Sequence, residues 1–208
     1  MKTCPFCAKE IQDAAIMCKH CGREVSSGPT KNKELTSTTN FTERMMGAAL
    51  CDVATYEEVE HDKNALGQAA VVVILSSLAA GIGTLNNGGG VGMLLGSTIG
   101  SMLSWAVWAL TTYLVGTKLL PEPSTQADLG QLLRTTGFAA APGVLRIFGI
   151  IPLLAVPINV ITAIWMLFTM IIAVRQALDY STTRRAVGVV VIGWILFIIL
   201  GAMMMMMT

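Results

Sequence analysis

The longest run without a charged side chain, from Asn64 to Thr117, most limits what this chain can fold into. A soluble domain keeps charged and polar side chains on its surface and would not leave so long a stretch without one. A bilayer core needs about 20 apolar residues per helix, so the run can hold two spans joined by the turn at 86–90. Only 13% of the chain is charged, against about 25% in soluble proteins, which also favours a membrane protein.

Further apolar segments predict three more spans, so we expect an all-α multi-pass bundle of five transmembrane helices in residues 64–208. The expected spans are residues 66–85, 91–114, 134–151, 158–174 and 186–206. Five spans put the two termini on opposite sides of the membrane. The basic residues between spans all fall on the N-terminal side: Lys63, Lys118, Arg134, Arg175, Arg184 and Arg185. The positive-inside rule then predicts a cytosolic N-terminus in the cytoplasmic membrane and a C-terminus on the opposite side.

Four cysteines form two close pairs near the N-terminus, Cys4 with Cys7 and Cys18 with Cys21. Two CxxC turns offer four thiolates in the tetrahedral arrangement that structural zinc prefers. Iron also fits such a site, but the short loop between the pairs favours zinc. A module of residues 1–25 is too small to fold on apolar burial alone, so we expect bound Zn²⁺ to supply most of its stability.

The stretch CPFCAKEIQDAAIMCKHCGREV resembles the short zinc ribbons at the N-termini of many prokaryotic membrane proteins. That resemblance implies metal ligands and no activity. Basic residues in the ribbon are interleaved with Glu10, Asp13 and Glu24, so it lacks the basic face typical of nucleic-acid binding. We expect a protein-docking module and no nucleic-acid partner.

Two segments connect the ribbon to the first span. Residues 26–40 are rich in Ser, Thr, Asn and Lys without apolar periodicity, which predicts a flexible linker. Residues 41–63 show apolar side chains at three- and four-residue steps, which predicts one amphipathic juxtamembrane helix, capped by Asn40 or Thr42. Its acidic run argues against anionic lipid, so we expect it to pack on the spans, with partner docking as the alternative. Cys51 within it is expected to be a small buried residue.

The second expected span carries Gly92, Gly96 and Gly100 at the four-residue spacing that lets helices approach closely in lipid. We expect this face to pack within the same chain, and homo-oligomerisation is the alternative. Trp105 and Trp108 near the end of the span suit a belt at the headgroups.

Arg146 is the most informative polar residue, because an arginine inside a span is costly and often functional. Its position near Pro152 suggests that the stem reaches the outer interface or that carbonyls pair with the head; a substrate-facing role is the alternative. In the loop before the last span, Arg175 and Asp179 are four residues apart and can form an ion pair or a docking patch.

Three segments carry a family resemblance: DVATYEEVEHDKNALGQA, LLRTTGFAAAPGVLRIFGIIP and WMLFTMIIAVRQALDYSTTRRAVGVVVIGWI. They resemble the prokaryotic branch of the Yip family over residues 42–205. The resemblance implies a five-span membrane protein with a cytosolic N-terminus. Its eukaryotic members are named for binding Ypt/Rab GTPases and act in vesicle traffic, a function that does not carry over to a prokaryotic chain with a zinc ribbon.

The residues contain no nucleophile–base pair, phosphate-binding glycine loop or paired carboxylates, so we expect no enzymatic activity and no catalytic residue. The leading hypothesis is a membrane scaffold or adaptor that meets a cytosolic or membrane protein partner through its zinc ribbon. A small-solute permease or channel with a cleft near Arg146, and a metal or redox sensor, are the alternatives.

Overall fold

The computed structural model describes residues 2–3, 10–11, 40–85, 91–123, 125 and 127–206. The chain divides into two compact units, Met1–Thr39 and Asn40–Thr208. In the first unit, β1 (Lys2–Thr3) pairs antiparallel with β2 (Glu10–Ile11), with Lys2 opposite Ile11. The four predicted metal ligands, Cys4, Cys7, Cys18 and Cys21, and all but the last residue of the predicted linker lie outside the described residues.

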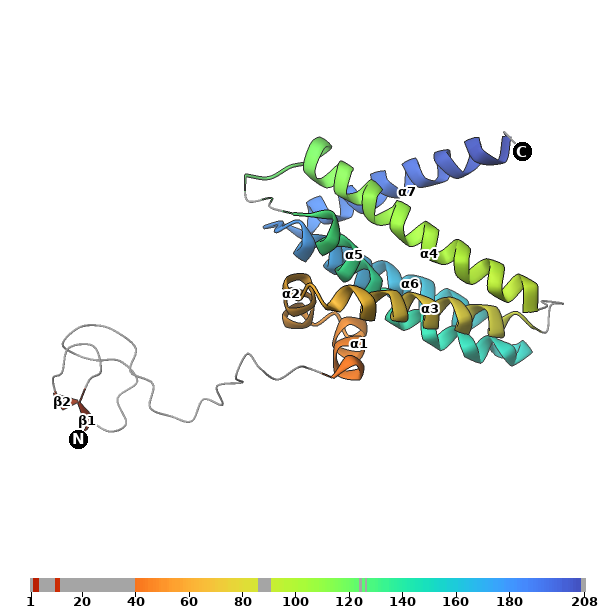
Figure 1. Cartoon of the computed structure of the whole chain (residues 1–208), viewed down its shortest axis with the longest axis horizontal. Coiled ribbons are helices and arrows are strands. Elements are labelled where there is room, and N and C mark those ends of the chain that lie inside the picture. Colours follow the sequence, from red (N-terminus) through yellow and green to blue (C-terminus); the bar gives the residue numbers. More distant parts are fainter. Residues whose placement is uncertain are drawn as a thin grey trace. The chain divides into compact units, whose positions relative to one another are not determined.

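The second unit is helical throughout its regular described elements (Figure 1). In order, these are α1 (Phe41–Ala49), α2 (Val53–His61), α3 (Ala65–Gly83), α4 (Val91–Leu114), the π-helical turn η2 (Val115–Leu119), α5 (Leu129–Phe138), the 3₁₀ helix η3 (Ala141–Ile150), α6 (Pro152–Ala177) and α7 (Thr183–Met206). The four long helices α3, α4, α6 and α7 run back and forth through the unit (Figure 1).

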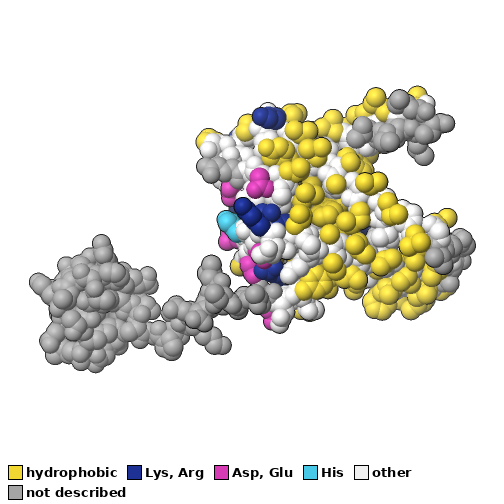
Figure 2. Space-filling model, viewed as in Figure 1, with side chains coloured by type: hydrophobic (Ala, Val, Ile, Leu, Met, Phe, Trp, Pro, Cys, Tyr) yellow, Lys and Arg dark blue, Asp and Glu magenta, His cyan; other side chains and the backbone are white. Residues whose placement is uncertain are grey.

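Three of the described helical segments are long and apolar enough to cross a membrane: Ala65–Gly83, Gly92–Leu119 and Pro152–Ala177. Exposed apolar side chains cover much of the face shown in Figure 2, while its charged side chains gather at one end. We call this end, formed by residues 41–63, 118–134 and 175–185, the charged end. The chain is therefore a multi-pass membrane protein whose charged end meets water.

The predicted single helix over residues 41–63 is two helices, α1 and α2, in the structure. Cys51 between them has φ 60°, a left-handed conformation that interrupts a right-handed helix. Asp52 then starts α2, because its carboxylate accepts the Thr55 backbone N–H at 3.2 Å and the Thr55 hydroxyl at 2.7 Å. At the start of α1, the Asn40 backbone N–H donates to the Glu43 carboxylate at 3.3 Å. The chain thus turns twice before it enters α3.

The predicted third span, residues 134–151, is also not one continuous helix. α5 ends at Phe138 and η3 begins at Ala141. Pro142 explains the break, because a proline lacks the N–H for an α-helical bond and its ring clashes with the carbonyl four residues earlier, that of Phe138. α5 itself begins at Asp128, whose carboxylate accepts the Gln131 N–H at 2.8 Å.

The last two predicted spans begin earlier than expected. α6 starts at Pro152 rather than 158, because a proline suits the first helical position, where its missing N–H has no partner anyway. Pro157 lies within α6, in its second turn. α7 starts at Thr183 rather than 186.

The close approaches of α3 involve η3 and the first turn of α4, and not Gly92, Gly96 or Gly100. A methyl group added at Gly143 would clash with the Ser76 side chain, and one added at Gly83 would clash with the Arg146 carbonyl. By contrast, a methyl group at Gly92, Gly96 or Gly100 would meet no atom within 4 Å beyond their own helix. These three glycines thus have open space beside them among the described residues, and both their packing within the chain and homo-oligomerisation through them stay predictions.

Candidate functional site

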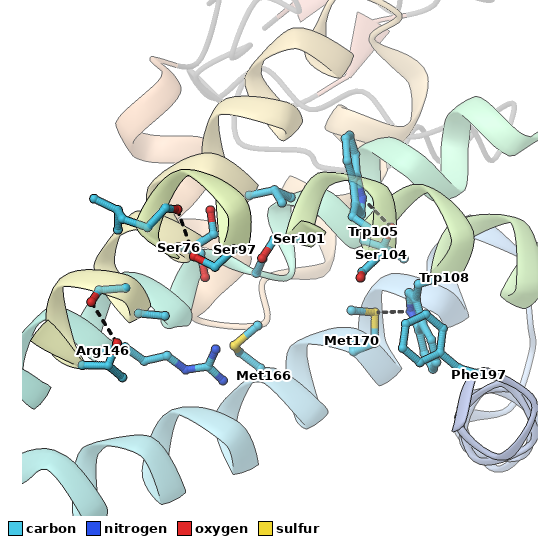
Figure 3. A pocket seen from close by; sticks show the side chains of 18 of the residues that line it. Ser76, Ser97, Ser101, Ser104, Trp105, Trp108, Arg146, Met166, Met170 and Phe197 are labelled. Atoms are coloured by element: carbon cyan, nitrogen blue, oxygen red, sulfur yellow. Dashed lines mark hydrogen bonds between the residues drawn. The ribbon is translucent and has the colours of Figure 1, made fainter. Parts of the chain in front are cut away.

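A cavity of about 720 Å³ lies between α3, α4, η3, α6 and α7 (Figure 3). Most of its wall is apolar and includes Leu94, Met166 and Phe197. Hydroxyl groups interrupt this wall at Ser76, Ser77, Thr84, Ser97, Ser101, Ser104 and Thr136. One of the lining side chains is charged, that of Arg146, and no carboxylate lines the cavity within the described residues. The cavity is therefore an apolar space with scattered hydroxyls and one cation.

Arg146 points into this cavity. Figure 3 shows its side chain extending toward Met166, and its Nε donates to the Thr162 hydroxyl at 3.3 Å. Thr162 lies ten residues after the start of α6, which is about 15 Å along the helix. The Arg146 guanidinium therefore lies beside α6, about 15 Å along that helix from its start. The hydrogen bond found for the Arg146 head goes to a hydroxyl group rather than to a carbonyl, and the expected reach of its stem to the outer interface stays a prediction.

Two tryptophans form the part of the cavity wall nearer the charged end. The Trp105 indole N–H donates to the Thr136 hydroxyl at 3.2 Å, and the Trp108 indole N–H points at the Met170 sulfur at 3.2 Å. Trp108 also packs edge to face on Phe197, with ring centroids 6.1 Å apart. Both indoles therefore bond inside the bundle, which corrects the expectation that they form a belt at the headgroups.

The serines of α4 differ in their hydrogen bonds. The Ser97 hydroxyl donates to the Leu94 carbonyl at 2.9 Å, the usual way for a serine to be satisfied within an apolar helix. The hydroxyls of Ser101 and Ser104 make no hydrogen bond to any described residue, and both face the cavity. They are available to a polar group inside it.

At the charged end, Arg44 ties α1 to α2 and α3. Its Nη2 lies 3.0 Å from Glu58 Oε1 and 2.8 Å from Asp62 Oδ2, and its Nη1 donates to Gln68 Oε1 at 3.0 Å. The Arg44 side chain is only 7% exposed. Burial without these partners would be costly, so the three acceptors explain how an arginine can sit inside this junction.

Arg134 of α5 holds the end of α2. Its Nε donates to the carbonyls of Val59 and Glu60, each at 3.1 Å, and its Nη2 also donates to the Glu60 carbonyl. These carbonyls belong to the last turn of α2, where a cation both fills the free acceptors and matches the helix dipole. Arg134 is buried, so this contact fixes α2 to the bundle.

Glu60 is a buried carboxyl group beside Arg134. The Gln131 side-chain amide donates to its Oε1 at 3.0 Å. Burial, followed by repulsion from the Asp179 carboxylate, raises the pKa of Glu60 to about 7, although His61 and Arg134 act in the opposite direction. Glu60 therefore changes its charge near neutral pH, at the place where α2, α5 and the α6–α7 loop meet.

The α6–α7 loop is tied to the segment after α4. The Tyr180 hydroxyl lies 2.9 Å from the Gly116 carbonyl and 2.8 Å from the Leu120 carbonyl. Arg185 pairs with Glu122, with Nε and Oε1 3.0 Å apart. These contacts join three helix ends at the charged end.

Arg175 and Asp179, singled out from the sequence, both lie at this loop. Arg175 Nε donates to the Tyr180 carbonyl at 3.3 Å, so it supports the loop backbone. Asp179 has φ 52°, a left-handed conformation that ends α6. The ion pair between the two side chains and the docking patch stay predictions.

Cys51 is the one cysteine among the described residues, and it is half-buried. Burial raises the pKa of its thiol, so the thiolate that would react or bind metal is disfavoured. Within the described residues no group of three His, Cys, Asp or Glu side chains could hold a metal ion. The predicted zinc ligands are outside this part of the chain, so the zinc site stays a prediction.

The sequence indicated Arg146 as a candidate residue, but it did not indicate the hydrogen-bond partners in the cavity and at the charged end. Thr162 and the unbonded serines look like ordinary polar residues of apolar helices, and Arg44 and Arg134 look like surface arginines near helix ends. A usable signal was present for Arg134, because a basic residue within a predicted span needs buried acceptors.

Comparisons with known proteins place the second unit. No curated protein and no solved structure matches the chain significantly. A family model, described as the Yip1 domain, matches residues 52–204, which include α2 and nearly all of the spans and the whole of the cavity wall. The match extends over well more than half of the sequence, and the chain therefore belongs to the Yip1 domain family.

Proposed function

We propose that this protein is a non-enzymatic scaffold or adaptor of the cytoplasmic membrane that presents an N-terminal zinc ribbon to a protein partner. The observation that carries the proposal is the anchoring of α1 and α2 through buried Arg44 and Arg134. The ribbon and its linker join the bundle at Asn40, directly before α1. The end of the expected flexible linker is thereby fixed to the bundle, which keeps a partner bound to the ribbon near the membrane.

The scaffold would cross the membrane five times, with α5 and η3 together forming the third crossing. Ten α-helical residues and ten 3₁₀ residues extend about 35 Å if collinear, enough for a bilayer core of about 30 Å. The irregular join would lie against α3 and α6, which suits a membrane because non-helical backbone is tolerated where protein buries it.

The orientation that we propose puts the charged end in the cytosol. Lys63, Lys118 and Arg134 belong to this end, as do the three basic residues around the α6–α7 loop, Arg175, Arg184 and Arg185. The positive-inside rule favours this orientation. It also keeps the four ribbon cysteines in a reducing compartment, where thiolates bind zinc rather than form disulfides.

The test is a comparison of the full chain with the Cys4→Ser, Cys7→Ser double variant. We expect the wild type to hold about one zinc per chain and the double variant to hold none, by elemental analysis of purified protein. Proteins crosslinked in native membranes should be lost from the double variant and kept by Cys51→Ser, the matched control outside the ribbon. An unchanged set of crosslinked proteins in the double variant, with the spans inserted, would contradict the docking role.

The cavity beside Arg146 favours one alternative, a small-solute permease. In that case, liposomes containing the protein would take up a solute and Arg146→Ala would change the rate. A broad solute panel without flux would exclude it. The third possibility, a metal or redox sensor, predicts reversible loss of zinc from the ribbon under mild oxidant.

A further inference from the structure

We infer that the cavity is a binding site for a single-chain anionic amphiphile, with an acid head on Arg146 and an acyl chain along the apolar wall. The ligand class is a long-chain carboxylate that enters from the bilayer. The inference rests on the charge of the cavity, the free donors of Arg146, the shape of the space and its access from lipid.

The positive charge of the cavity favours an anionic ligand. Arg146 is the one charged residue in the described lining, and no acidic residue faces it there. A guanidinium carries five N–H donors, and the hydrogen bond found for the described part of the chain uses only Nε, toward Thr162. The two Nη groups can therefore take a carboxylate in the paired geometry that arginine favours.

Two hydroxyl groups in the same cavity wall also lack a hydrogen-bond partner among the described residues. Ser101 and Ser104 face the cavity from α4 with no described hydrogen-bond partner. Figure 3 shows the Arg146 side chain and these serines around the same space. A carboxylate held by Arg146 has further acceptor capacity, which hydroxyl donors or a bridging water can satisfy.

The shape favours a chain over a compact solute. The lining on α4 extends from Met93 to Trp108, about 22 Å along the helix axis. The volume of about 720 Å³ falls in the range of roughly 300–1,000 Å³ usual for small-molecule sites. Most of the surface is apolar, so the part of the ligand beyond its head must be apolar as well.

Access comes from the lipid side. Three lining side chains are strongly exposed on the surface of the bundle: Met93 at 68%, Trp194 at 55% and Ile198 at 64%. In Figure 1, α4 and α7 diverge away from the charged end. An amphiphile dissolved in the bilayer can reach such a wall, whereas a water-soluble anion would first have to cross apolar surface.

Brominated acyl chains quench tryptophan on contact, so Trp105 and Trp108 in the cavity wall report on the site, whereas the lipid-exposed Trp194 is also quenched by probe that is not bound. The full chain is placed in nanodiscs of zwitterionic lipid and titrated with a brominated stearate. We expect saturable quenching, relieved by unbrominated stearate. A brominated stearyl alcohol, which has the same chain and no charge, should bind at least about tenfold more weakly, since a charge-assisted hydrogen bond is lost.

Variants separate the head site from the chain site. Arg146→Gln should weaken stearate binding about tenfold or more and leave alcohol binding unchanged, while Arg146→Lys keeps most of the acid preference. Arg184→Gln, an exposed arginine outside the cavity, is the matched control and should bind as wild type. Ser101→Phe would place a ring in the apolar space of the cavity and should weaken the binding of both probes.

Four results would contradict the proposed ligand. Equal affinity of wild type and Arg146→Gln for stearate, or equal affinity of wild type for acid and alcohol, would show that Arg146 does not recognise the head. Displacement by a two-chain anionic phospholipid but not by stearate would overturn the single-chain ligand. Displacement by acetate alone would replace the amphiphile with a small solute.

Discussion

Arg134 at the charged end and Arg146 beside the cavity are both withdrawn from water, but their surroundings differ. Arg134 is almost fully buried and donates to two carbonyls at the end of α2. Arg146 is half-buried, and its hydrogen bond among the described residues goes to one threonine hydroxyl. The first arginine is fully used by the fold, and the second keeps donors free. A charge that the fold does not need to satisfy, placed in a cavity, is the pattern expected of a binding group.

The two regions also differ in how their helices pack. At the charged end, α2 and α5 bury large side chains such as Tyr56 and Leu132 completely. Around the cavity, α4 and α7 leave many apolar side chains exposed, including Leu103 and Ile195. The charged end is thus tightly packed, whereas α4 and α7 present apolar side chains to the bilayer and border the cavity. Four experiments test this difference.

The largest expected effect is on stability in Arg134→Leu. The substitution removes the donors of the α2 carbonyls and leaves them buried without partners, so we expect a loss of about 3 kcal/mol. Thermal unfolding in detergent, followed by circular dichroism, measures it. Arg184→Gln should melt as the wild type does. An Arg134→Leu variant with unchanged melting would show that α2 is not held by this contact.

A smaller effect is expected in the α3–η3 seam. Gly143→Ala would force a methyl group onto Ser76 and should cost about 2 kcal/mol, as overpacking usually does. Gly96→Ala in α4 has open space and should be neutral or slightly stabilising, because alanine favours helix. Melting temperatures of the two variants compare the seams directly. A loss in Gly96→Ala would instead indicate a tightly packed partner on α4, such as a second copy of the chain.

A pH effect of about 1–2 kcal/mol is expected from Glu60. Its folded pKa of about 7 lies above the ordinary value of 4.5, so the folded state holds its proton more tightly. The contribution of Glu60 to the free energy of unfolding should be largest below pH 4.5. It should fall as the pH rises to 7, where the carboxyl group of the folded protein ionises. Glu60→Gln should flatten the melting temperature between pH 5 and 7 relative to wild type. An identical slope in both proteins would assign the dependence to another group.

Much of the bundle could be predicted from sequence, and the reasons for the failures are local. The bounds of α3 and α4 followed from the charge-free run, since apolar length translates directly into a span. Pro142 is itself a signal for a helix break, but the apolar pattern around it led to the prediction of one continuous span. The break at Cys51 had none, because a cysteine at positive φ is unusual and depends on tertiary contacts.

The cavity lay beyond sequence reasoning for a different reason. The direction of Arg146 depends on Thr162, sixteen residues away and on another helix. The cavity lies between α3, α4, η3, α6 and α7, and hydropathy does not encode how these elements are placed. The glycine spacing in α4 predicts a face that could pack closely, but a spacing motif does not say which partner covers that face.

The most direct test of the contrast between the two arginines is one melting experiment on three proteins, with and without stearate. Ligand at a large excess over its Kd should raise the wild-type melting temperature by about 5 °C. Arg134→Leu should start lower and show the same rise. Arg146→Leu should start at or above wild type, because a poorly compensated charge is removed, and should show no rise. A stearate-induced rise in Arg146→Leu equal to that of wild type, or a collapse of Arg146→Leu as deep as that of Arg134→Leu, would contradict the account.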